Sequence, residues 1–478
     1  MSNASAPEAG TVGGPAAGRG PAWLLPPDDV NALVPGLWSR TAGKDANGRL
    51  VIGGVGVDEL AAEHGTPVYV LDEADLRSRA GEFREAFAGV DVYYAGKAFL
   101  CGAVAQWVHD EGLSLDVCSG GELALALASG MPAKRVAFHG NNKSDDELAA
   151  AVHAGVGKLV IDSFEEIARL AELVRVSGRD CSVLVRVTPG VEAHTHEFMA
   201  TAHEDQKFGL SIAEGHALEA VRRVVAVPGL RLRGLHSHIG SQIFGTAGFE
   251  VAIRRVLALH ARIRHELHLS LPELGLGGGF GIAYTTRDTP STPQALADGL
   301  LGIVRRECAA LDLAVPRLSI EPGRAVVGPA MCTLYRVGTT KQVPLSGGAV
   351  RSYVSVDGGM SDNPRTALYG AAHSCTLASR RSSADASLTR VVGKHCESGD
   401  IVVRDEFLPG DVRPGDLLAV PGTGAYCRSM ASNYNHVPRP AVVAVRDGRA
   451  EVVVRAERVE DLMRLDVVAG RGSQWGQG

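Results

Sequence analysis

Short apolar runs alternate regularly with helix-like segments between about residue 66 and residue 330 of this chain. The first five runs begin about 22 residues apart, and stretches such as GELALALASG and SFEEIARLAELVRV fill the gaps. Eight strand–helix units in about 250 residues favour an α/β fold of the (β/α)8 TIM-barrel type. The alternative, an open Rossmann sheet, would carry a glycine fingerprint after its first strand, and none is there. The eight predicted strands are 92–95, 113–117, 136–138, 158–161, 183–187, 232–235, 273–276 and 317–320.

The pattern changes after residue 330 to strands without intervening helices, which predicts a second, all-β domain of the sandwich or barrel type. In VVAVRDGRAEVVVRA, Asp447 and Gly448 supply the positive φ angles of a tight hairpin turn. The strand-like GRLVIGGV near residue 50 is expected to pair into the same sheet. We therefore expect a flexible tail at 1–27, an N-terminal segment at 28–65 that pairs with the β-domain, a barrel at 66–330 and the β-domain at 331–478.

Charge and cysteine usage limit the partners and the compartment of such a protein. The net charge of −6 argues against nucleic acid or an anionic membrane as the main partner. No apolar run approaches the ~18 residues of a membrane span, and the N-terminus lacks the features of a secretion signal. Eight scattered cysteines without a CxxC pair are typical of reduced thiols, so we expect a cytoplasmic protein.

Polar residues follow the predicted strands, at the end of the barrel where such folds hold their active sites. Each has a structural alternative, such as a helix cap or a salt bridge, but a lysine, acids, an arginine and histidines converge on one end. These residues are Lys97, Asp116, Ser119, His139, Asn141, Asp162, Arg186, His236, His238, Ser241, Gly277, Gly278, Gly279, Glu321 and Arg324.

Two neighbouring loops favour a phosphate ligand. The glycines from 277 to 279 expose backbone amides after the seventh strand, and Gly323 and Arg324 of EPGR lie in the next loop. A glycine turn that only reverses the chain is the alternative for the first loop. The second loop supports the phosphate interpretation because it supplies a guanidinium group beside the glycines.

A phosphate site near a lysine and a carboxylate suggests pyridoxal 5'-phosphate. A lysine amine can bind the aldehyde of this cofactor, and Glu321 would keep its pyridine nitrogen protonated. Only 8 of the 48 basic residues are lysines, and Lys97 in YYAGKAF follows a barrel strand. Because Tyr94 and Phe99 flank it, we expect apolar surroundings that favour the neutral amine.

With these motifs the chain resembles the diaminopimelate decarboxylases, in the alanine-racemase-like, fold type III group of pyridoxal phosphate enzymes. YYAGKAF, HSHIGSQI, GGGFGI and EPGR resemble the barrel motifs, and MSDNPRTALYG, GKHCESGD and GAYCRSMASNYN resemble those of the β-domain. The resemblance spans about residues 50–440. It departs at Thr366, where the family often has proline, and this leaves Arg365 and Tyr369 in place.

The resemblance implies which residues bind the cofactor. Lys97 would hold it, His238 would stack on its ring, and Glu321 would pair with the ring nitrogen. Tyr426 would touch both the cofactor and the substrate. The phosphate would lie against Ser241, Gly277, Gly278, Gly279, Gly323 and Arg324.

The resemblance also implies the substrate, meso-2,6-diaminopimelate, which is decarboxylated to L-lysine and CO2 in the last step of lysine biosynthesis. Arg324, Arg365 and Tyr369 would hold the distal end of the substrate, and Glu397 would face its ammonium group. Cys396 would donate a proton after CO2 leaves. In the family the CE motif comes from the other subunit, so a homodimer that shares Cys396 and Glu397 across its interface is implied. The residues agree, because two arginines suit a distal carboxylate that ornithine lacks.

Other functions remain open at this stage. The chain could decarboxylate ornithine or arginine, act as a racemase with Tyr426 as its second base, or bind pyridoxal phosphate without catalysis. A metal-dependent barrel hydrolase could use His236 and His238, with His194 and His196 nearby. We expect no metal, because the sequence places neither a carboxylate nor a third histidine beside the HSH segment.

Overall fold

A closed barrel of eight parallel strands forms the larger part of the computed structural model, which describes residues 20–190, 207–345 and 348–467. Neighbouring strands pair in parallel around the ring, and β8 closes it by pairing with β9. Each of the eight strands predicted from the sequence is confirmed. The barrel strands are β5 (Asp91–Ala95), β6 (Ser114–Val117), β7 (Val136–Phe138), β8 (Lys158–Ile161), β9 (Cys181–Thr188), β11 (Leu230–His236), β12 (Glu273–Gly278) and β13 (Arg317–Glu321).

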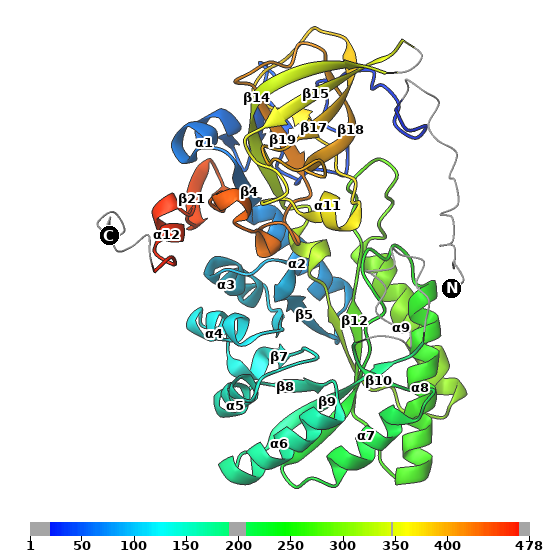
Figure 1. Ribbon diagram of the computed structural model, residues 1–478. Helices are drawn as coiled ribbons and strands as arrows, with labels where there is room; N and C mark the ends of the chain where they lie inside the picture. The colour runs from blue at the N-terminus through cyan, green and yellow to red at the C-terminus, as the bar shows by residue number, and fades with distance from the viewer. Residues whose placement is uncertain (1–19, 191–206, 346–347, 468–478) are drawn as a thin grey trace, which may run out of the picture.

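Helices surround this barrel and cover its apolar strands (Figure 1). Serine side chains cap three of them by accepting hydrogen bonds from backbone amides, at Ser119, Ser144 and Ser163. The buried faces of strands and helices join in one large apolar core that includes Phe138, Leu170 and Phe249. The helices are α2 (Glu73–Ala86), α3 (Gly102–Asp110), α4 (Gly120–Ala128), α5 (Asp145–Ala154), α6 (Phe164–Ser177), α7 (His216–Val225), α8 (Ala247–Leu267), α9 (Pro293–Ala310) and α10 (Arg324–Val327).

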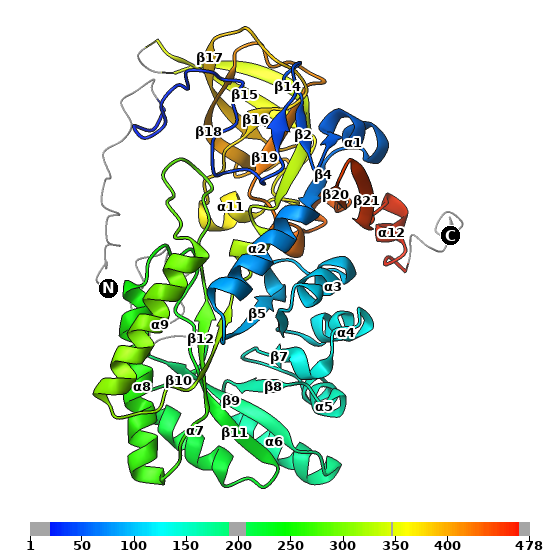
Figure 2. The same ribbon diagram turned by 180° about the vertical axis from the view of Figure 1, so that it is seen from behind.

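A second, mostly β part lies at one end of the molecule, beyond the barrel (Figures 1 and 2). Its central strand β14 (Met331–Pro344) pairs with β4 (Val68–Asp72) and β19 (Leu417–Pro421) through its first half and with β15 (Val350–Val356) through its second. Strands β17 (Ala386–Val392), β18 (Ile401–Pro409), β20 (Ala441–Arg446) and β21 (Arg449–Val454) extend the sheet, and β16 (Thr376–Leu377) pairs with β19. Strand β4 falls inside the range expected for the barrel, yet it pairs with β14 and β20.

The second part also holds short helices, α11 (Arg365–Tyr369) and α12 (Val459–Met463), between and after its strands. The predicted hairpin is present: β20 and β21 are joined by Asp447 and Gly448, whose φ angles are 50° and 75°. The turn adopts the positive φ values that the sequence predicts.

The segment near residue 50 does not pair into the sheet of the β-domain, contrary to the expectation from its sequence. Its strand β2 (Leu50–Ile52) belongs to a separate three-stranded sheet with β1 (Gly43–Lys44) and β3 (Val55–Gly56). This small sheet is followed by α1 (Val57–His64) and packs its apolar side chains against β4 and β14. Backbone hydrogen bonds join this segment to the second part of the chain, from the Leu50 amide to the Ala378 carbonyl (2.8 Å), from the Arg381 amide to the Asn47 carbonyl (2.7 Å) and from the Gly448 amide to the Gly53 carbonyl (2.7 Å). The segment therefore packs on the large sheet instead of extending it.

The tail predicted at 1–27 lies outside the described residues up to residue 19. From residue 20 onward the chain is placed against the protein, with the Arg287 guanidinium 4.3 Å from the centre of the Trp23 ring. No helix among the described residues is long and apolar enough to span a membrane.

Candidate active site

A cavity of about 330 Å³ opens where the carboxyl ends of the barrel strands meet the second part of the chain. Because parallel strands present their following loops at the same end, the barrel brings together residues far apart in the sequence. Ten of the predicted site residues contribute to its wall. The lining residues are Ala95, Lys97, Phe208, His238, Gly240, Ser241, Gly279, Phe280, Glu321, Gly323, Arg324, Arg365, Tyr369 and Tyr426.

Lys97 lies in a short 3₁₀ turn, η1 (Gly96–Ala98), directly after β5, and its side chain is exposed toward the cavity. Burial by the surrounding protein would lower the pKa of the amine, but neighbouring acidic groups raise it above its ordinary value. These groups are Tyr426, Cys118, Asp116 and Glu321. This pKa shift is opposite to the one expected from the apolar sequence neighbours of Lys97, because acidic side chains of β6 and β13 act on the amine.

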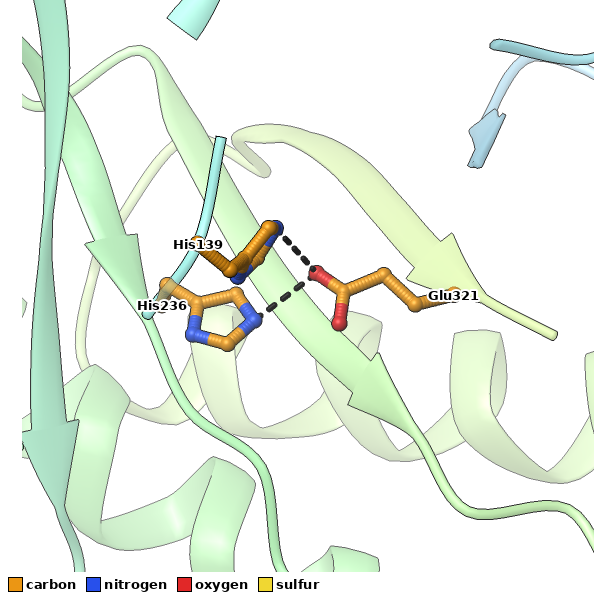
Figure 3. A group of neighbouring side chains, drawn as sticks. All are labelled: His139, His236 and Glu321. Atoms are coloured by element: carbon orange, nitrogen blue, oxygen red, sulfur yellow. Dashed lines mark hydrogen bonds and ion pairs between the residues drawn. The ribbon is translucent and has the colours of Figure 1, made fainter. Parts of the chain in front are cut away.

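Glu321 ends β13 and lies 2.8 Å from His236 Nε2 through its Oε1 atom, with His139 Nε2 at 3.5 Å (Figure 3). Burial would raise the pKa of Glu321, but the hydrogen-bonded His236 lowers it well below its ordinary value. Asp116 shows the opposite behaviour, because burial and the charge of Glu321 raise its pKa well above the usual range. The pKa values of these two neighbouring carboxyl groups are therefore shifted in opposite directions, and Glu321 is the one that lines the cavity.

His238 follows β11 and lines the cavity, whereas His236 on the strand itself faces Glu321. The Gly278 amide donates a hydrogen bond to His238 Nδ1 (3.2 Å), which fixes the ring orientation. Burial, with the nearby positive charges of Lys97 and Arg186, lowers the pKa of His238 well below its ordinary value. A neutral ring held in this way is suited to lie flat against a planar ligand.

The three glycines at the end of β12 differ in position: Gly277 and Gly278 are its last two residues, and Gly279 follows it. Gly279 lines the cavity, but Gly277 and Gly278 do not. A Cβ atom on Gly278 would lie 2.1 Å from the Glu321 carbonyl oxygen, and one on Gly279 would lie 2.2 Å from the Gly240 carbonyl oxygen. Gly278 and Gly279 are thus needed for the close approach of neighbouring backbones. The sequence suggests either a phosphate loop or a chain-reversing turn, and neither interpretation includes this reason.

Arg324 and Ser241 contribute linked polar groups to the cavity wall. Arg324 Nη2 donates to Ser241 Oγ (2.9 Å), and Nη1 donates to the hydroxyl of Tyr284 (2.5 Å). The Arg324 guanidinium also lies 4.6 Å from the centre of the Tyr426 ring. Its Nε atom is buried and has no hydrogen-bond partner among the residues that the structure describes.

Arg365 and Tyr369 reach the cavity from α11 in the second part of the chain. The Arg365 guanidinium lies 4.2 Å from the centre of the Tyr284 ring, and its Nη1 lies 3.4 Å from His373 Nε2. Thr366, the departure from the family pattern, is buried and donates to the Val402 carbonyl at 3.2 Å. Its hydroxyl therefore ties α11 to β18 without touching the cavity wall.

Cys396 and Glu397 are not among the residues that line this cavity. Both are exposed and lie in the loop between β17 and β18. Their predicted roles in proton donation and substrate binding therefore cannot be filled within this cavity of a single chain.

The remaining predicted polar residues support the wall. Arg186 lies 3.9 Å from Asp162 and 4.5 Å from the centre of the Phe208 ring, and Phe208 lines the cavity. Ser119 is the N-cap of α4. The salt-bridge alternative for Arg186 matches this pairing, whereas the cap of α6 is Ser163 and not Asp162, for which a helix cap was the alternative.

Sequence reasoning missed Phe208, Tyr284 and His373. Tyr284 follows the glycine loop by five residues, and its position beside a proposed phosphate loop was an available signal. Phe208 and His373 lie in segments with no recognisable motif, and only the fold brings them to the site.

The residues present fit pyridoxal phosphate. An amine, an ionised carboxylate and a neutral histidine ring line one cavity, and they match the aldehyde, the ring nitrogen and the ring face of the cofactor. The unpartnered Arg324 Nε, beside the Ser241 hydroxyl, is a donor available to an anion such as phosphate.

The expectation that neither a carboxylate nor a further histidine lies beside the HSH segment is wrong, because Glu321 and His139 lie next to His236. One ligand atom each from His139, His236 and Glu321 lie within 4.8 Å of one another (Figure 3). His238 faces the cavity instead of joining this group, and the 2.8 Å contact of His236 with Glu321 is a hydrogen bond. His194 and His196 lie outside the described residues.

Comparisons with known proteins agree with this chemistry. Residues 73–328 match the pyridoxal binding domain of the pyridoxal-dependent decarboxylases. The diaminopimelate decarboxylase of Mycobacterium tuberculosis (strain ATCC 25618 / H37Rv) is 55% identical over 440 residues, which cover 91% of this chain and 98% of that protein. That of Bacillus subtilis (strain 168) is 46% identical over 431 residues, 89% of this chain and 97% of that protein.

The fold also resembles a solved structure of diaminopimelate decarboxylase from M. jannaschii in co-complex with L-lysine. The TM-score is 0.83 and the sequence identity 30%, with 90% of this chain and 98% of the other covered.

Proposed function

This chain belongs to the diaminopimelate decarboxylase family, and from that membership we propose how its own residues act. It is a pyridoxal phosphate-dependent lyase that converts meso-2,6-diaminopimelate to L-lysine and CO2. The observation that carries the assignment of roles is the cavity that brings Lys97, Glu321 and two arginines together.

The bound cofactor supplies an electron sink for the carbanion that forms when CO2 leaves. Lys97 would anchor it, Glu321 would hold the proton on the ring nitrogen, and His238 would pack against the ring. Ser241, Gly279, Gly323 and Arg324 would bind its phosphate. The hydrogen bond from His236 to Glu321 supports this arrangement, because it keeps the carboxylate ionised and oriented.

The substrate carries a carboxylate and an ammonium group at the end that does not react. Arg324 and Arg365 offer planar, paired donors that match a carboxylate. Tyr369 and Tyr426 border the same space. A substrate without the distal carboxylate would leave the buried Arg365 guanidinium without an anion, and this supports a diacid substrate over ornithine.

Cys396 and Glu397 act in the cavity of a second copy of the chain. Their exposure, and the exposure of Leu368 on α11 at 54%, fit a surface that a partner subunit covers. In such a homodimer Cys396 would deliver the proton and Glu397 would face the distal ammonium group. All eight cysteines are free thiols, which supports a reducing compartment such as the cytoplasm.

The test offers meso-diaminopimelate, L-lysine, L-ornithine and L-arginine separately to the holoenzyme and measures CO2 release. We expect release from diaminopimelate only, and release from ornithine or arginine instead would overturn the substrate assignment. Lys97→Ala should reduce release to background, because among the described residues Lys97 is the one amine that lines the cavity. Borohydride should fix the cofactor covalently to the wild-type chain but not to Lys97→Ala, read as the mass of the intact protein.

A further inference from the structure

Tyr284 lies behind the cavity wall and contacts both of its arginines. The residue is buried, with 5% of its surface exposed, and is absent from the residues that line the cavity. Its hydroxyl accepts a hydrogen bond from Arg324 Nη1 (2.5 Å), and its ring face lies 4.2 Å from the Arg365 guanidinium. One side chain therefore joins an arginine of the barrel to an arginine of the second part of the chain.

The backbone of Tyr284 is held in place. The Asp288 carboxylate accepts hydrogen bonds from the amides of Tyr284 (3.0 Å) and Thr285 (2.9 Å). On the ring side, a Cβ atom at Gly422 would lie 3.2 Å from the ring, so Gly422 gives the aromatic group its room. A ring fixed in this way can determine where two flexible guanidinium groups lie.

Two like charges on one wall repel each other when no anion lies between them. The negative face of an aromatic ring attracts a cation, and a hydroxyl oxygen accepts a hydrogen bond from one, so Tyr284 offsets part of this repulsion for each arginine. His373 completes the wall: its ring meets that of Tyr284 edge to face at 5.1 Å, and its Nε2 faces Arg365. Burial and the charge of Arg365 lower the pKa of His373 to about 3, so it adds no third positive charge.

We infer that Tyr284 is a positioning residue that holds Arg324 and Arg365 side by side and thereby sets the preference for substrates with a distal carboxylate. This inference rests on the proposed function and names the residue that determines its specificity. Tyr284 acts through the arginines, because it does not line the cavity itself.

The test compares two competitive inhibitors that differ in the distal carboxylate. L-lysine, the product, retains that carboxylate, and cadaverine lacks it. In Tyr284→Phe, which keeps the ring under Arg365 but removes the hydroxyl acceptor, the inhibition constant of L-lysine should rise about tenfold. Tyr284→Leu also removes the ring and should raise it by a further factor of about ten. The constant of cadaverine should stay within about twofold of wild type in both variants.

The KM for diaminopimelate should rise in parallel with the L-lysine constant, and kcat should fall less, since the lost contacts act on binding. Tyr353→Phe is the matched control. The hydroxyl of Tyr353, a residue of β15, also accepts a hydrogen bond from an arginine, Arg390 (3.4 Å). Neither inhibition constant is expected to change in this variant. Equal shifts for both inhibitors, or no shift for either, would overturn the inference. A wild-type enzyme that releases no CO2 from diaminopimelate would instead refute the proposed function.

Discussion

Two neighbouring carboxyl groups of similar chemistry have pKa values that are shifted in opposite directions. Glu321 is hydrogen-bonded to His236 and its pKa lies well below the ordinary value, whereas burial and the charge of Glu321 raise the pKa of Asp116. Two buried like charges at short range are costly, so ionisation of one carboxyl group disfavours ionisation of the other. Glu321, whose ionised form is favoured, lies on β13 and lines the cavity, where a protonated ring nitrogen would need a counterion.

A buried histidine away from the site should make the barrel sensitive to acid. His260 on α8 is 6% exposed, its Nε2 has no hydrogen-bond partner among the described residues, and burial lowers its pKa from 6.5 to about 4. Between these values the unfolded chain binds a proton that the folded chain does not. The free energy of unfolding is therefore not reduced by His260 above its unfolded-state pKa of 6.5, and it decreases as the pH falls toward the folded-state pKa of about 4. At about pH 5 the loss should be about 2 kcal/mol.

His260→Leu should remove this part of the pH dependence. Urea unfolding at about pH 7.5 and about pH 5 measures it, and the wild type should lose more stability between the two than the variant does. His265 is exposed on the same helix, so His265→Gln should leave the wild-type dependence unchanged. Equal losses in the wild type and in His260→Leu would show that His260 is not responsible.

The sequence identifies those site residues that follow a strand and belong to a motif. It does not identify residues whose role depends on contacts made only in the folded chain. Lys97 could be found because lysine is rare in this chain and this one directly follows a barrel strand. Its protonation could not, because the pKa depends on Asp116 and Glu321 from other strands. Tyr284 carries no reactive group of its own, and its contact with Arg365 exists only after the two parts of the chain have packed.

The pairing of β12 with β13 depends on glycine at the end of β12. Gly278 lies opposite Glu321 in the register, where a Cβ atom would come within 2.1 Å of the Glu321 carbonyl oxygen. A methyl group there must displace backbone, because the obstructing atom is not at the end of a flexible side chain. The strand end that carries Glu321 would move with it.

Gly278→Ala should therefore weaken cofactor binding by about tenfold or more and cost about 1–3 kcal/mol of stability. Titration of the apoenzyme with pyridoxal phosphate measures the first effect, and thermal unfolding measures the second. Gly302 on α9 is the matched control, since it is exposed and a Cβ atom there meets no atom within 4 Å. Gly302→Ala should leave cofactor binding unchanged and raise stability by up to about 1 kcal/mol. Unchanged cofactor affinity in Gly278→Ala would contradict this role of the glycine.

The eight barrel strands were predictable because a parallel strand covered on both faces is a continuous apolar run, and such runs stand out between amphipathic helices. The pairing of β4 was not predictable in the same way. Its sequence VYVLD is buried throughout and resembles a barrel strand, but its partners β14 and β20 lie far along the chain. A local apolar pattern reports burial and carries no information about which sheet a strand joins.

The two parts of the molecule meet beside Lys97. The Tyr426 amide and the Ser429 hydroxyl both donate to the Ala98 carbonyl, each at 2.9 Å, so the second part is fixed to the residue next to Lys97. Arg365 and Tyr369 reach the cavity from the same part. The barrel contributes Lys97, His238 and Glu321 to the cavity wall, and the second part contributes Arg365, Tyr369 and Tyr426. A complete site therefore requires both, and the proposed dimer adds a third contributor.

If Cys396 acts across a subunit interface, two defective chains should repair each other. Lys97→Ala lacks the cofactor anchor, and Cys396→Ala lacks the proton donor, so each homodimer should be nearly inactive. In a hybrid dimer one cavity combines the intact Lys97 of one chain with the intact Cys396 of the other. Half of the dimers formed from an equal mixture are hybrids with one working site each, so activity should recover to about a quarter of wild type after unfolding and joint refolding.

The double variant Lys97→Ala/Cys396→Ala, mixed with wild type in the same way, is the control, because its hybrids carry no cavity with both groups intact. Joint refolding should therefore lower the activity of that mixture to about half of what the two chains give when they are refolded apart. No recovery in the first mixture, with hybrid dimers verified by differently tagged chains, would place Cys396 outside the partner's site.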